Sequence, residues 1–163
     1  MSTYIRDTAI VLRVRPHRER DAWVSFWTRH HGKQEAYATG LQTSTSKQRA
    51  HLQPFAEVEL MLAEGKQFLR VAVAQMTAHH GSAARVHPVW SGILGAICRL
   101  CEALSGPQDP LEDERIFLLF RFVRERAAAF TLPFSPERAL FVQAFLLQRF
   151  AGLFGYRVPV QQC

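Results

Sequence analysis

The residues of this sequence with the clearest chemical purpose are cations near the N-terminus, which are suited to binding phosphate. Arg13 and Arg15 alternate with apolar residues, and Arg18 and Arg20 follow in a charged segment. Guanidinium groups are planar forks that fit phosphate oxygens, and a surface of such groups binds nucleic acid in a salt-dependent way. The predicted DNA-binding residues are Arg13, Arg15, Arg18, Arg20, Lys33, Lys47 and Arg49.

The overall charge agrees with a polyanionic partner. Twenty Lys and Arg residues outnumber fourteen Asp and Glu residues in the chain of 163 residues, which gives a net charge of +6. Such an excess attracts nucleic acid before other partners. The same composition also fits a genome rich in G and C, which favours arginine codons. The cluster could equally be a solvated face paired with Glu19 and Asp21.

Two tryptophans add a second feature that is found in nucleic-acid-binding proteins. Trp23 and Trp27 share one face of a predicted strand, and Val24 and Phe26 share the other. An exposed aromatic ring on a barrel strand can stack on a base, whereas large aromatic side chains are more often buried. Packing of the two indole rings against a second domain is therefore the favoured alternative.

Signatures of catalysis and of metal binding are absent from the sequence. It contains no G-x-x-x-x-G-K-[ST], no G-x-G-x-x-G, no G-x-S-x-G and no H-E-x-x-H. Cys98 and Cys101 form one C-x-x-C pair in an apolar helical segment, which indicates two buried thiols more than half of a zinc site. The histidine doublets at 30–31 and 79–80 lack the i, i+4 spacing of a helical metal pair. We expect a protein that is not an enzyme, with no catalytic residues, no cofactor and no metal.

Five segments alternate apolar and polar residues with the period of two that indicates half-buried strands. In the first segment, Ile10, Leu12 and Val14 are predicted to share one face, with Val11, Arg13 and Arg15 on the other. The predicted strands are residues 4–15, 22–29, 33–39, 55–62 and 68–77. Five short strands without a long helix between them predict a small antiparallel barrel, compatible in length with an OB-fold.

Helical spacing replaces strand alternation after residue 82. Helices are predicted over 88–104, from Asp109-Pro110 to residue 129, and from Ser135-Pro136 to residue 154, with Gly155 as a C-cap. The predicted fold is therefore α+β: a five-stranded antiparallel OB-fold barrel over 1–80, followed by an all-helical domain over 81–163. No apolar run is long enough for a membrane span and no signal peptide pattern is present, so a cytoplasmic location is expected.

The order of short motifs along the chain carries a family resemblance. The N-terminal motifs are Ala9-Ile10-Val11-Leu12-Arg13, Arg18-Glu19-Arg20-Asp21, Phe26-Trp27-Thr28-Arg29 and Gly32-Lys33. Later motifs are Ala38-Thr39-Gly40, Leu52-Gln53-Pro54-Phe55, Val58-Glu59-Leu60 and Leu153-Phe154-Gly155-Tyr156 with Pro159. This order resembles the RecO family of recombination mediators over nearly the whole chain. The N-terminal motifs are fairly specific for that family, and the helical middle is not.

The resemblance implies a DNA repair and recombination mediator with an OB-fold domain and a helical domain. Such a protein binds single- and double-stranded DNA, anneals complementary strands and assists the loading of RecA. Its implied protein partners are RecR and the tail of single-strand DNA-binding protein. The resemblance also implies a nucleoid-associated location, no enzymatic activity and no membrane contact.

Two departures from the family pattern bear on function. Family members carry a basic A-K-G-x-R loop after the third strand, whereas Thr39 and Gln42 occupy the lysine and arginine positions here. DNA binding is therefore expected to depend on the arginines from Arg13 to Arg20. The sequence ends at Cys163, where the first cysteine of the family's zinc element would fall, so we expect a short form without that element.

A protein-interaction adaptor is the main alternative to a DNA-binding mediator. It would keep the fold and bind DNA weakly, and a groove between the helices would take an acidic peptide tail that ends in a hydrophobic residue. The predicted partner-binding residues are Arg121, Arg124 and Arg126. These arginines could instead form a solvated helix face paired with Glu125. An unrecognised hydrolase or metalloenzyme is the third and weakest hypothesis.

Overall fold

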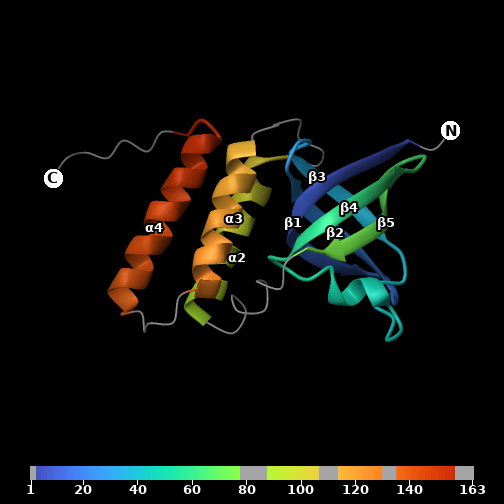
Figure 1. Cartoon of the computed structure of the whole chain (residues 1–163), viewed down its shortest axis with the longest axis horizontal. Coiled ribbons are helices and arrows are strands. Elements are labelled where there is room, and N and C mark those ends of the chain that lie inside the picture. The colour runs from blue at the N-terminus through green and yellow to red at the C-terminus, as the bar shows by residue number, and fades with distance from the viewer. Residues whose placement is uncertain (1–2, 78–87, 107–113, 130–134, 157–163) are drawn as a thin grey trace.

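In the described part of the chain, three α-helices pack on one side of a closed β-barrel (Figure 1). The computed structural model describes residues 3–77, 88–106, 114–129 and 135–156. The strands are β1 (Tyr4–His17), β2 (Asp21–Thr28), β3 (Lys33–Ala38), β4 (Glu57–Glu64) and β5 (Leu69–Met76). The helices are the 3₁₀-helix η1 (Lys47–Ala50) and the α-helices α2 (Pro88–Leu104), α3 (Glu114–Ala129) and α4 (Pro136–Leu153). None of the helices in these residues is both long and apolar enough to cross a lipid bilayer.

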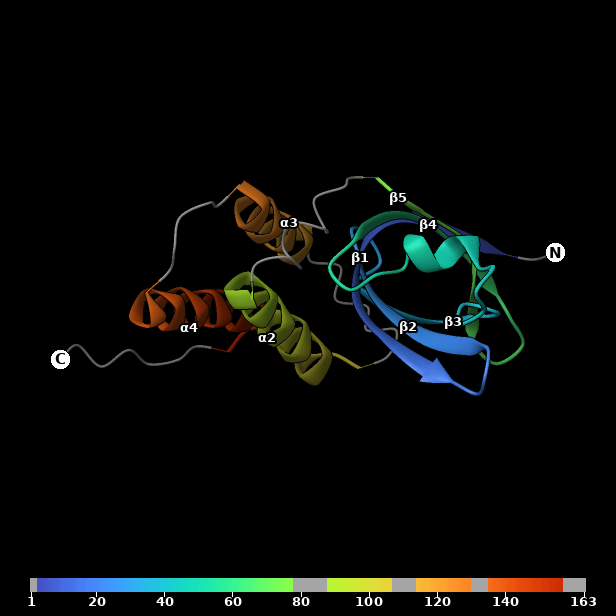
Figure 2. The ribbon, with the colours of Figure 1, turned by 90° about the horizontal axis from the view of Figure 1, so that it is seen from below.

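The long strand β1 closes the barrel because it pairs with a different neighbour at each end. Its first residues lie antiparallel to β4 and its last residues lie antiparallel to β2, which gives the order β1-β2-β3-β5-β4. A short parallel pairing between β3 and β5 completes the barrel. In it, Ala36 faces Leu69 and Tyr37 faces Arg70. The predicted α+β class and OB-fold are confirmed, with one parallel pairing in a barrel that was expected to be antiparallel throughout. The short 3₁₀-helix η1 lies across the lower end of the barrel (Figures 1 and 2).

A β-bulge in β1 changes which side chains face the barrel interior. The register with β2 shifts between Val11 and Arg13, so Leu12 is the extra residue. Val11 and Val14 both face the barrel core, whereas Leu12 packs with the helices. The predicted alternation, which placed Val14 with Leu12, is wrong for this reason. Arg13 remains on the outer surface because it follows the bulge.

Small residues fill the barrel interior. Ala9, Ala22, Ala36 and Ala38 are fully buried there, together with larger side chains such as Phe26. A barrel of five strands has a narrow interior, so side chains fill it completely and leave no channel.

A second core joins the outside of the barrel to the helices. Trp27 is fully buried against α2 and α4, and its ring centroid lies 5.4 Å from that of Phe154. Ile10 and Leu12 of β1 and Phe55, just before β4, belong to the same cluster. Figure 2 shows the three helices on this one side of the barrel. The barrel and the helices are therefore not independent, because the outer face of the barrel supplies part of the helical core.

The helix ends follow from local sequence. Ser135 caps α4, where its hydroxyl accepts a hydrogen bond of 3.3 Å from the Arg138 N–H, and Pro136 fits the first turn. Gly155 follows α4 with a φ of 84°, a left-handed conformation that favours glycine. These predicted start and stop signals are confirmed. The predicted start of the preceding helix at Asp109, and the boundary between residues 80 and 81, lie outside the described residues.

A buried ion pair crosses the interface between barrel and helices. Arg124 of α3 is 1% exposed and donates to the Glu57 carboxylate at the start of β4. Arg121 also approaches this carboxylate, at 3.7 Å. Burial lowers the pKa of Arg124, although the negative charge of Glu57 opposes that effect. Nearby, Glu114 of α3 accepts from Arg29 at 2.6 Å. The orientation of α3 on the barrel is thus fixed by charge pairing as well as by apolar packing.

We expect Glu57→Ala to lower the free energy of unfolding by about 3–5 kcal/mol, because Arg124 would remain buried without a counter-ion. Urea unfolding measures this change. Glu125→Ala is the matched control, since it removes an exposed partner of Arg121 and should cost less than about 1 kcal/mol. Equal effects of the two substitutions would show that the buried pair has no special role.

Candidate nucleic-acid interface

The first two predicted cations lie on the open outer surface of β1. The side chains of Arg13 and Arg15 are 58% and 54% exposed. Each is held by one carboxylate: Arg13 lies 3.4 Å from Glu102 of α2, and Arg15 lies 3.2 Å from Glu35 of β3. Exposed ion pairs of this kind contribute at most about 1 kcal/mol, so a phosphate group can replace the carboxylate.

The next two cations lie in the tight turn between β1 and β2. Arg18 and Arg20 are both exposed, and Arg18 has a left-handed φ of 57°. The Arg20 carbonyl accepts a hydrogen bond of 2.8 Å from the Gln42 N–H, which brings the loop after β3 next to this turn. Further along the same loop, Lys47 and Arg49 are exposed on η1. Six of the seven predicted cations are therefore accessible.

Lys33 corrects the prediction, because it is buried and does not belong to this surface. Its ammonium group is turned towards the C-terminal end of α2, where it donates to the carbonyls of Ser105 at 2.9 Å and Glu102 at 3.4 Å. The last carbonyls of a helix lack intrahelical donors and carry partial negative charge, which explains why a cation binds there. Lys33 is thus a structural residue of the interface between barrel and helices.

A row of four side chains crosses the outer face of the barrel in register. Arg15 of β1 faces Trp23 of β2, Trp23 faces Tyr37 of β3, and Tyr37 faces Arg70 of β5. Residues that face each other in neighbouring strands project from the same side of a sheet. Two aromatic rings therefore lie side by side, with an arginine beyond each of them.

Phe68, immediately before β5, completes this arrangement. We call Trp23, Tyr37 and Phe68 the aromatic platform. Their ring centroids are 5.2–5.4 Å apart, with interplanar angles of 52–71°. The Arg70 guanidinium lies 5.6 Å from the centroid of the Phe68 ring, and His17 contacts the edges of the cluster. All three platform residues are half-buried, so part of each ring is open to solvent.

Asp21 fixes the platform to the surrounding loops. Its carboxylate accepts from the Tyr37 hydroxyl at 2.6 Å and from the Gly40 N–H at 2.7 Å. These hydrogen bonds lower the pKa of Asp21, with the larger effect from Gly40, and the same contact raises the pKa of Tyr37. Tyr37 is therefore held in one orientation.

Sequence reasoning identified only part of this surface. Trp27 is fully buried against the helices, which agrees with the alternative that was favoured, whereas Trp23 is partly open. Tyr37, Phe68 and Arg70 were missed because the row crosses strands that are far apart in the chain. One feature of the sequence could have located Tyr37. Ala36 and Ala38 of β3 face the barrel interior, so Tyr37 between them must face outward.

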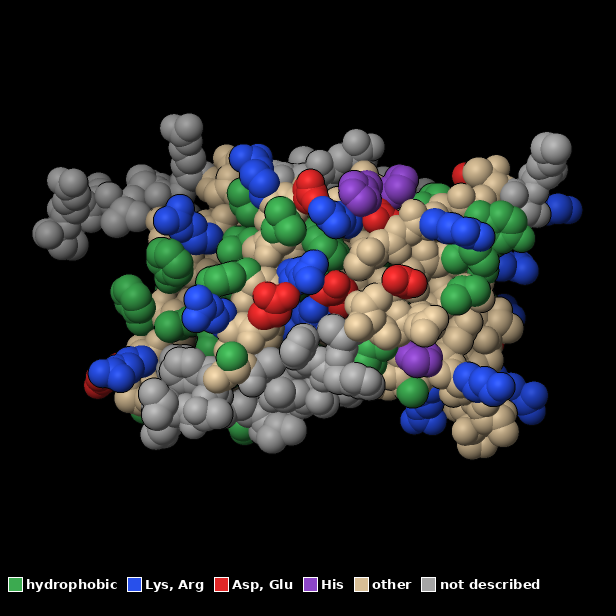
Figure 3. Space-filling view, in the orientation of Figure 1, with side chains coloured by type: hydrophobic (Ala, Val, Ile, Leu, Met, Phe, Trp, Pro, Cys, Tyr) green, Lys and Arg blue, Asp and Glu red, His purple; other side chains and the backbone are tan. Residues whose placement is uncertain are grey.

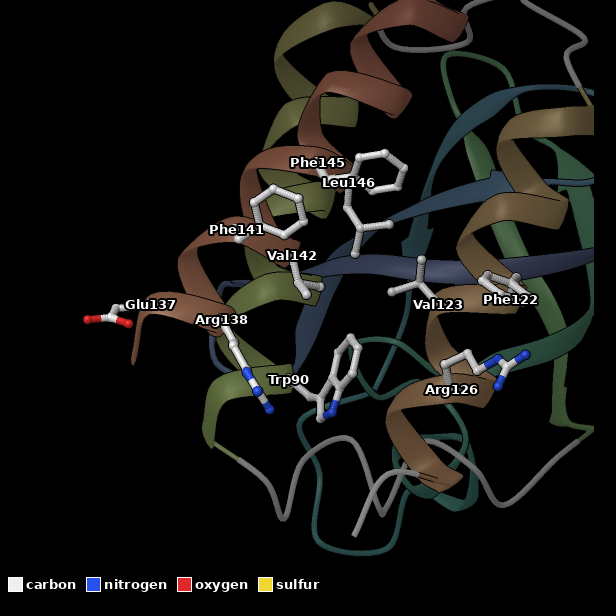
Figure 4. A pocket seen from close by; sticks show the side chains of 10 residues that line it. All are labelled: Trp90, Phe122, Val123, Arg126, Glu137, Arg138, Phe141, Val142, Phe145 and Leu146. Carbon is white, nitrogen blue, oxygen red and sulfur yellow. The ribbon is translucent and has the colours of Figure 1, made fainter. Parts of the chain in front are cut away.

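The predicted partner-binding arginines do not line one groove. Arg124 is buried with Glu57, so its assignment to a peptide groove is wrong, and Arg121 pairs with Glu57 and Glu125. Arg126 does line a groove of about 680 Å³ between α3 and α4, which we call the α3–α4 groove. Figure 4 shows α3 and α4 supplying side chains to the groove, with Trp90 of α2 between them. The lining residues are Trp90, Phe122, Val123, Arg126, Glu137, Arg138, Phe141, Val142, Phe145 and Leu146.

The cysteine and histidine candidates form no metal site in the part of the chain that the structure describes. Cys98 and Cys101 are buried in α2, and burial raises the pKa of Cys101 to about 12 and holds that of Cys98 well above its usual value. His30 and His31 each place Nδ1 at 2.9 Å from the carboxylate of Asp7. The doublet at 79–80 lies outside the described residues.

A closed barrel of this strand order defines an OB-fold, the class in which strands two and three and the β1–β2 and β4–β5 loops bind oligonucleotides and oligosaccharides. The sequence model of the family described as "Recombination protein O N terminal" matches residues 1–80. The chain belongs to the RecO family.

Relatives of this family match the helical half as well. The DNA repair protein RecO of Bifidobacterium animalis subsp. lactis is 28% identical over 97% of this chain, and that of Pelotomaculum thermopropionicum is 29% identical over all of it. The DNA repair protein RecO of Bifidobacterium longum subsp. infantis is 40% identical over 51% of this chain. The matched segments cover 64%, 59% and 34% of these relatives, so the chain spans between about one third and two thirds of their length.

We expect Lys33→Met to lower the free energy of unfolding by about 1–3 kcal/mol, because two carbonyls at the end of α2 would lose their donor. Lys47→Met removes the same charge from an exposed position and should change stability by less than about 0.5 kcal/mol. Thermal unfolding of the two variants measures the difference. A stability loss for Lys47→Met as large as that for Lys33→Met would contradict the structural role of Lys33.

Proposed function

We propose that this protein is a DNA-binding mediator of repair and recombination that acts in the cytoplasm at the nucleoid and is not an enzyme. The observation that carries the proposal is the row Arg15–Trp23–Tyr37–Arg70 on the open face of the barrel, beside the exposed turn of Arg18 and Arg20. This face coincides with the side of the OB-fold that binds oligonucleotides. Membership of the RecO family supports the same conclusion.

The mediator binds both single- and double-stranded DNA, since phosphates are common to both. Arginines that neutralise phosphates reduce the repulsion between two strands, and this is how such a surface would favour annealing of complementary strands. We further propose that the protein assists the loading of RecA and contacts RecR and the tail of single-strand DNA-binding protein. These finer activities are inferred from the family resemblance.

Salt dependence tests the phosphate contacts. The wild-type protein should bind a labelled oligonucleotide at low salt, with an affinity that falls steeply as salt rises. Arg18→Gly should reduce the slope of log affinity against log salt by about 0.7–0.9, the value for one lost contact. The substitution removes the cation without strain, because glycine readily adopts the left-handed φ found at this position.

Fluorescence anisotropy at several salt concentrations measures both slopes. Arg138→Gln is the control, because it removes one positive charge from an exposed position on α4, outside the barrel. If the wild-type protein does not bind at low salt, the proposed function is wrong. If both variants change the slope equally, net charge rather than the turn is responsible.

A second candidate function, docking of a peptide, is supported by the α3–α4 groove. Its lining is largely apolar, and Phe122, Phe141 and Phe145 are 51%, 73% and 46% exposed. Figure 3 shows hydrophobic side chains gathered over α3 and α4, with arginines among them. Arg126 and Arg138 outnumber Glu137 among the lining residues, so the groove carries a net positive charge. An acidic peptide tail that ends in a hydrophobic residue fits this combination of apolar lining and positive charge.

We expect a synthetic acidic peptide that ends in phenylalanine to bind this groove, and Arg126→Ala to weaken it at least about fivefold, since an arginine at a binding hot spot contributes more than about 1 kcal/mol. Isothermal titration calorimetry measures the affinity. Arg99→Ala, at an exposed position on α2 outside the groove, should leave binding unchanged. Peptide binding without any DNA binding would favour the adaptor over the mediator.

A further inference from the structure

We propose that the aromatic platform stacks on the unpaired bases of single-stranded nucleic acid, so that this face of the barrel prefers single strands to duplex. The inference rests on the proposed DNA binding and adds a source of selectivity to it. The residues that carry it are Trp23, Tyr37 and Phe68. Cations bind the phosphates of any strand, whereas aromatic rings distinguish free bases from paired ones.

The platform lies where a bound strand would bring its bases. Arg15 and Arg70 are register neighbours of Trp23 and Tyr37, so a cation is placed on each side of the two rings. A strand whose phosphates contact these arginines must pass over the rings between them. Alternation of a basic groove with aromatic rings is how single-stranded nucleic acid is bound without sequence preference.

Each platform residue is partly open to solvent, and the rings are already fixed in place. The contacts among the three platform rings are tilted or edge-to-face, with angles of 52–71°, so none of them is stacked in parallel on another. Asp21 holds the Tyr37 hydroxyl, and Trp23 contacts both Tyr37 and Phe68. Little rotamer freedom remains to be lost on binding, which favours affinity.

A recess beside Phe68 offers room for a nucleotide next to the platform. It has a volume of about 560 Å³ and is formed by the loop between β4 and β5, with Lys66 and Arg70 among its lining residues. This loop and the β1–β2 turn are the two loops that bind ligands in OB-folds. The recess therefore continues the path of a strand from the platform and Arg70 towards one further cation, Lys66.

A duplex gains nothing from these rings, because its bases are already stacked on one another and paired. Stacking of a free base on an aromatic side chain contributes about 1–3 kcal/mol per base, equivalent to a gain in affinity of about fivefold to about 150-fold. Phosphate contacts alone give no such difference between a strand with bases and one without. A higher affinity for a strand with bases than for an abasic strand therefore distinguishes base stacking from charge attraction.

The test compares three probes with the full chain at one low salt concentration: oligothymidylate, an abasic strand of the same length, and a duplex of the same length. We expect oligothymidylate to bind the wild-type protein about tenfold tighter than the abasic strand. Oligothymidylate should also quench tryptophan fluorescence, and Trp23 would be the source. The other two tryptophans, Trp27 and Trp90, are 0% and 5% exposed and out of reach of a base.

Trp23→Leu should abolish the quenching and most of the preference for oligothymidylate over the abasic strand, while affinity for the duplex stays the same. Trp23→Phe keeps a ring and should keep most of the preference, which guards against a folding defect in the leucine variant. Tyr156→Leu, an exposed aromatic that follows α4 and lies outside the α3–α4 groove, is the control and should change none of the three affinities.

The outcomes distinguish a failure of the inference alone from a failure of the proposed function. If the wild-type protein binds the abasic strand and oligothymidylate equally, DNA binding stands and stacking is wrong. If Trp23→Leu weakens all three probes alike, the platform has only a structural role and the inference is again overturned. If no probe binds, the proposed function and the inference fail together.

Discussion

The docking of the helices on one end of the outer barrel face is the constraint on which the other features depend. Ile10, Trp27 and Lys33 face one another across β1, β2 and β3, and all three are covered by the helices. Arg15, Trp23 and Tyr37 project from the same face of these strands but lie outside the area that the helices cover. They are four residues away along β2 and β3, and five along the bulged β1. One face of one sheet therefore has two uses: a buried end that holds the domains together and an open end available to a ligand.

The same division assigns the cations their roles. At the covered end Lys33 satisfies the last carbonyls of α2, and in the middle Arg13 reaches Glu102 of that helix. At the open end Arg15 has only a nearby, exposed pairing with Glu35. Desolvation makes a buried cation dependent on its partner, as for Arg124, whereas an exposed pair exchanges readily with other anions. Position along the strand, more than residue type, thus decides which cations are structural.

Much of the fold could be predicted from the sequence because its signals are local. Strand alternation located all five strands, and the Ser135–Pro136 cap located the start of α4. The bulge at Leu12 could not be predicted, since one extra residue in β1 has meaning only opposite β2. The burial of Lys33 and Arg124 also escaped prediction, because each depends on a group more than sixty residues away in the chain. The platform was missed for the same reason: it is assembled by register between strands and not by spacing along one of them.

The short parallel pairing between β3 and β5 has a consequence for the mechanics of the barrel. It consists of two residue pairs, Ala36 with Leu69 and Tyr37 with Arg70, and among the described strands it is the only parallel contact. The seam where the barrel closes therefore runs between Tyr37 and Arg70. A ligand that contacts both side chains would connect β3 to β5 from outside and stabilise the closed barrel. Occupancy of the surface and rigidity of the barrel are then linked, so that each favours the other.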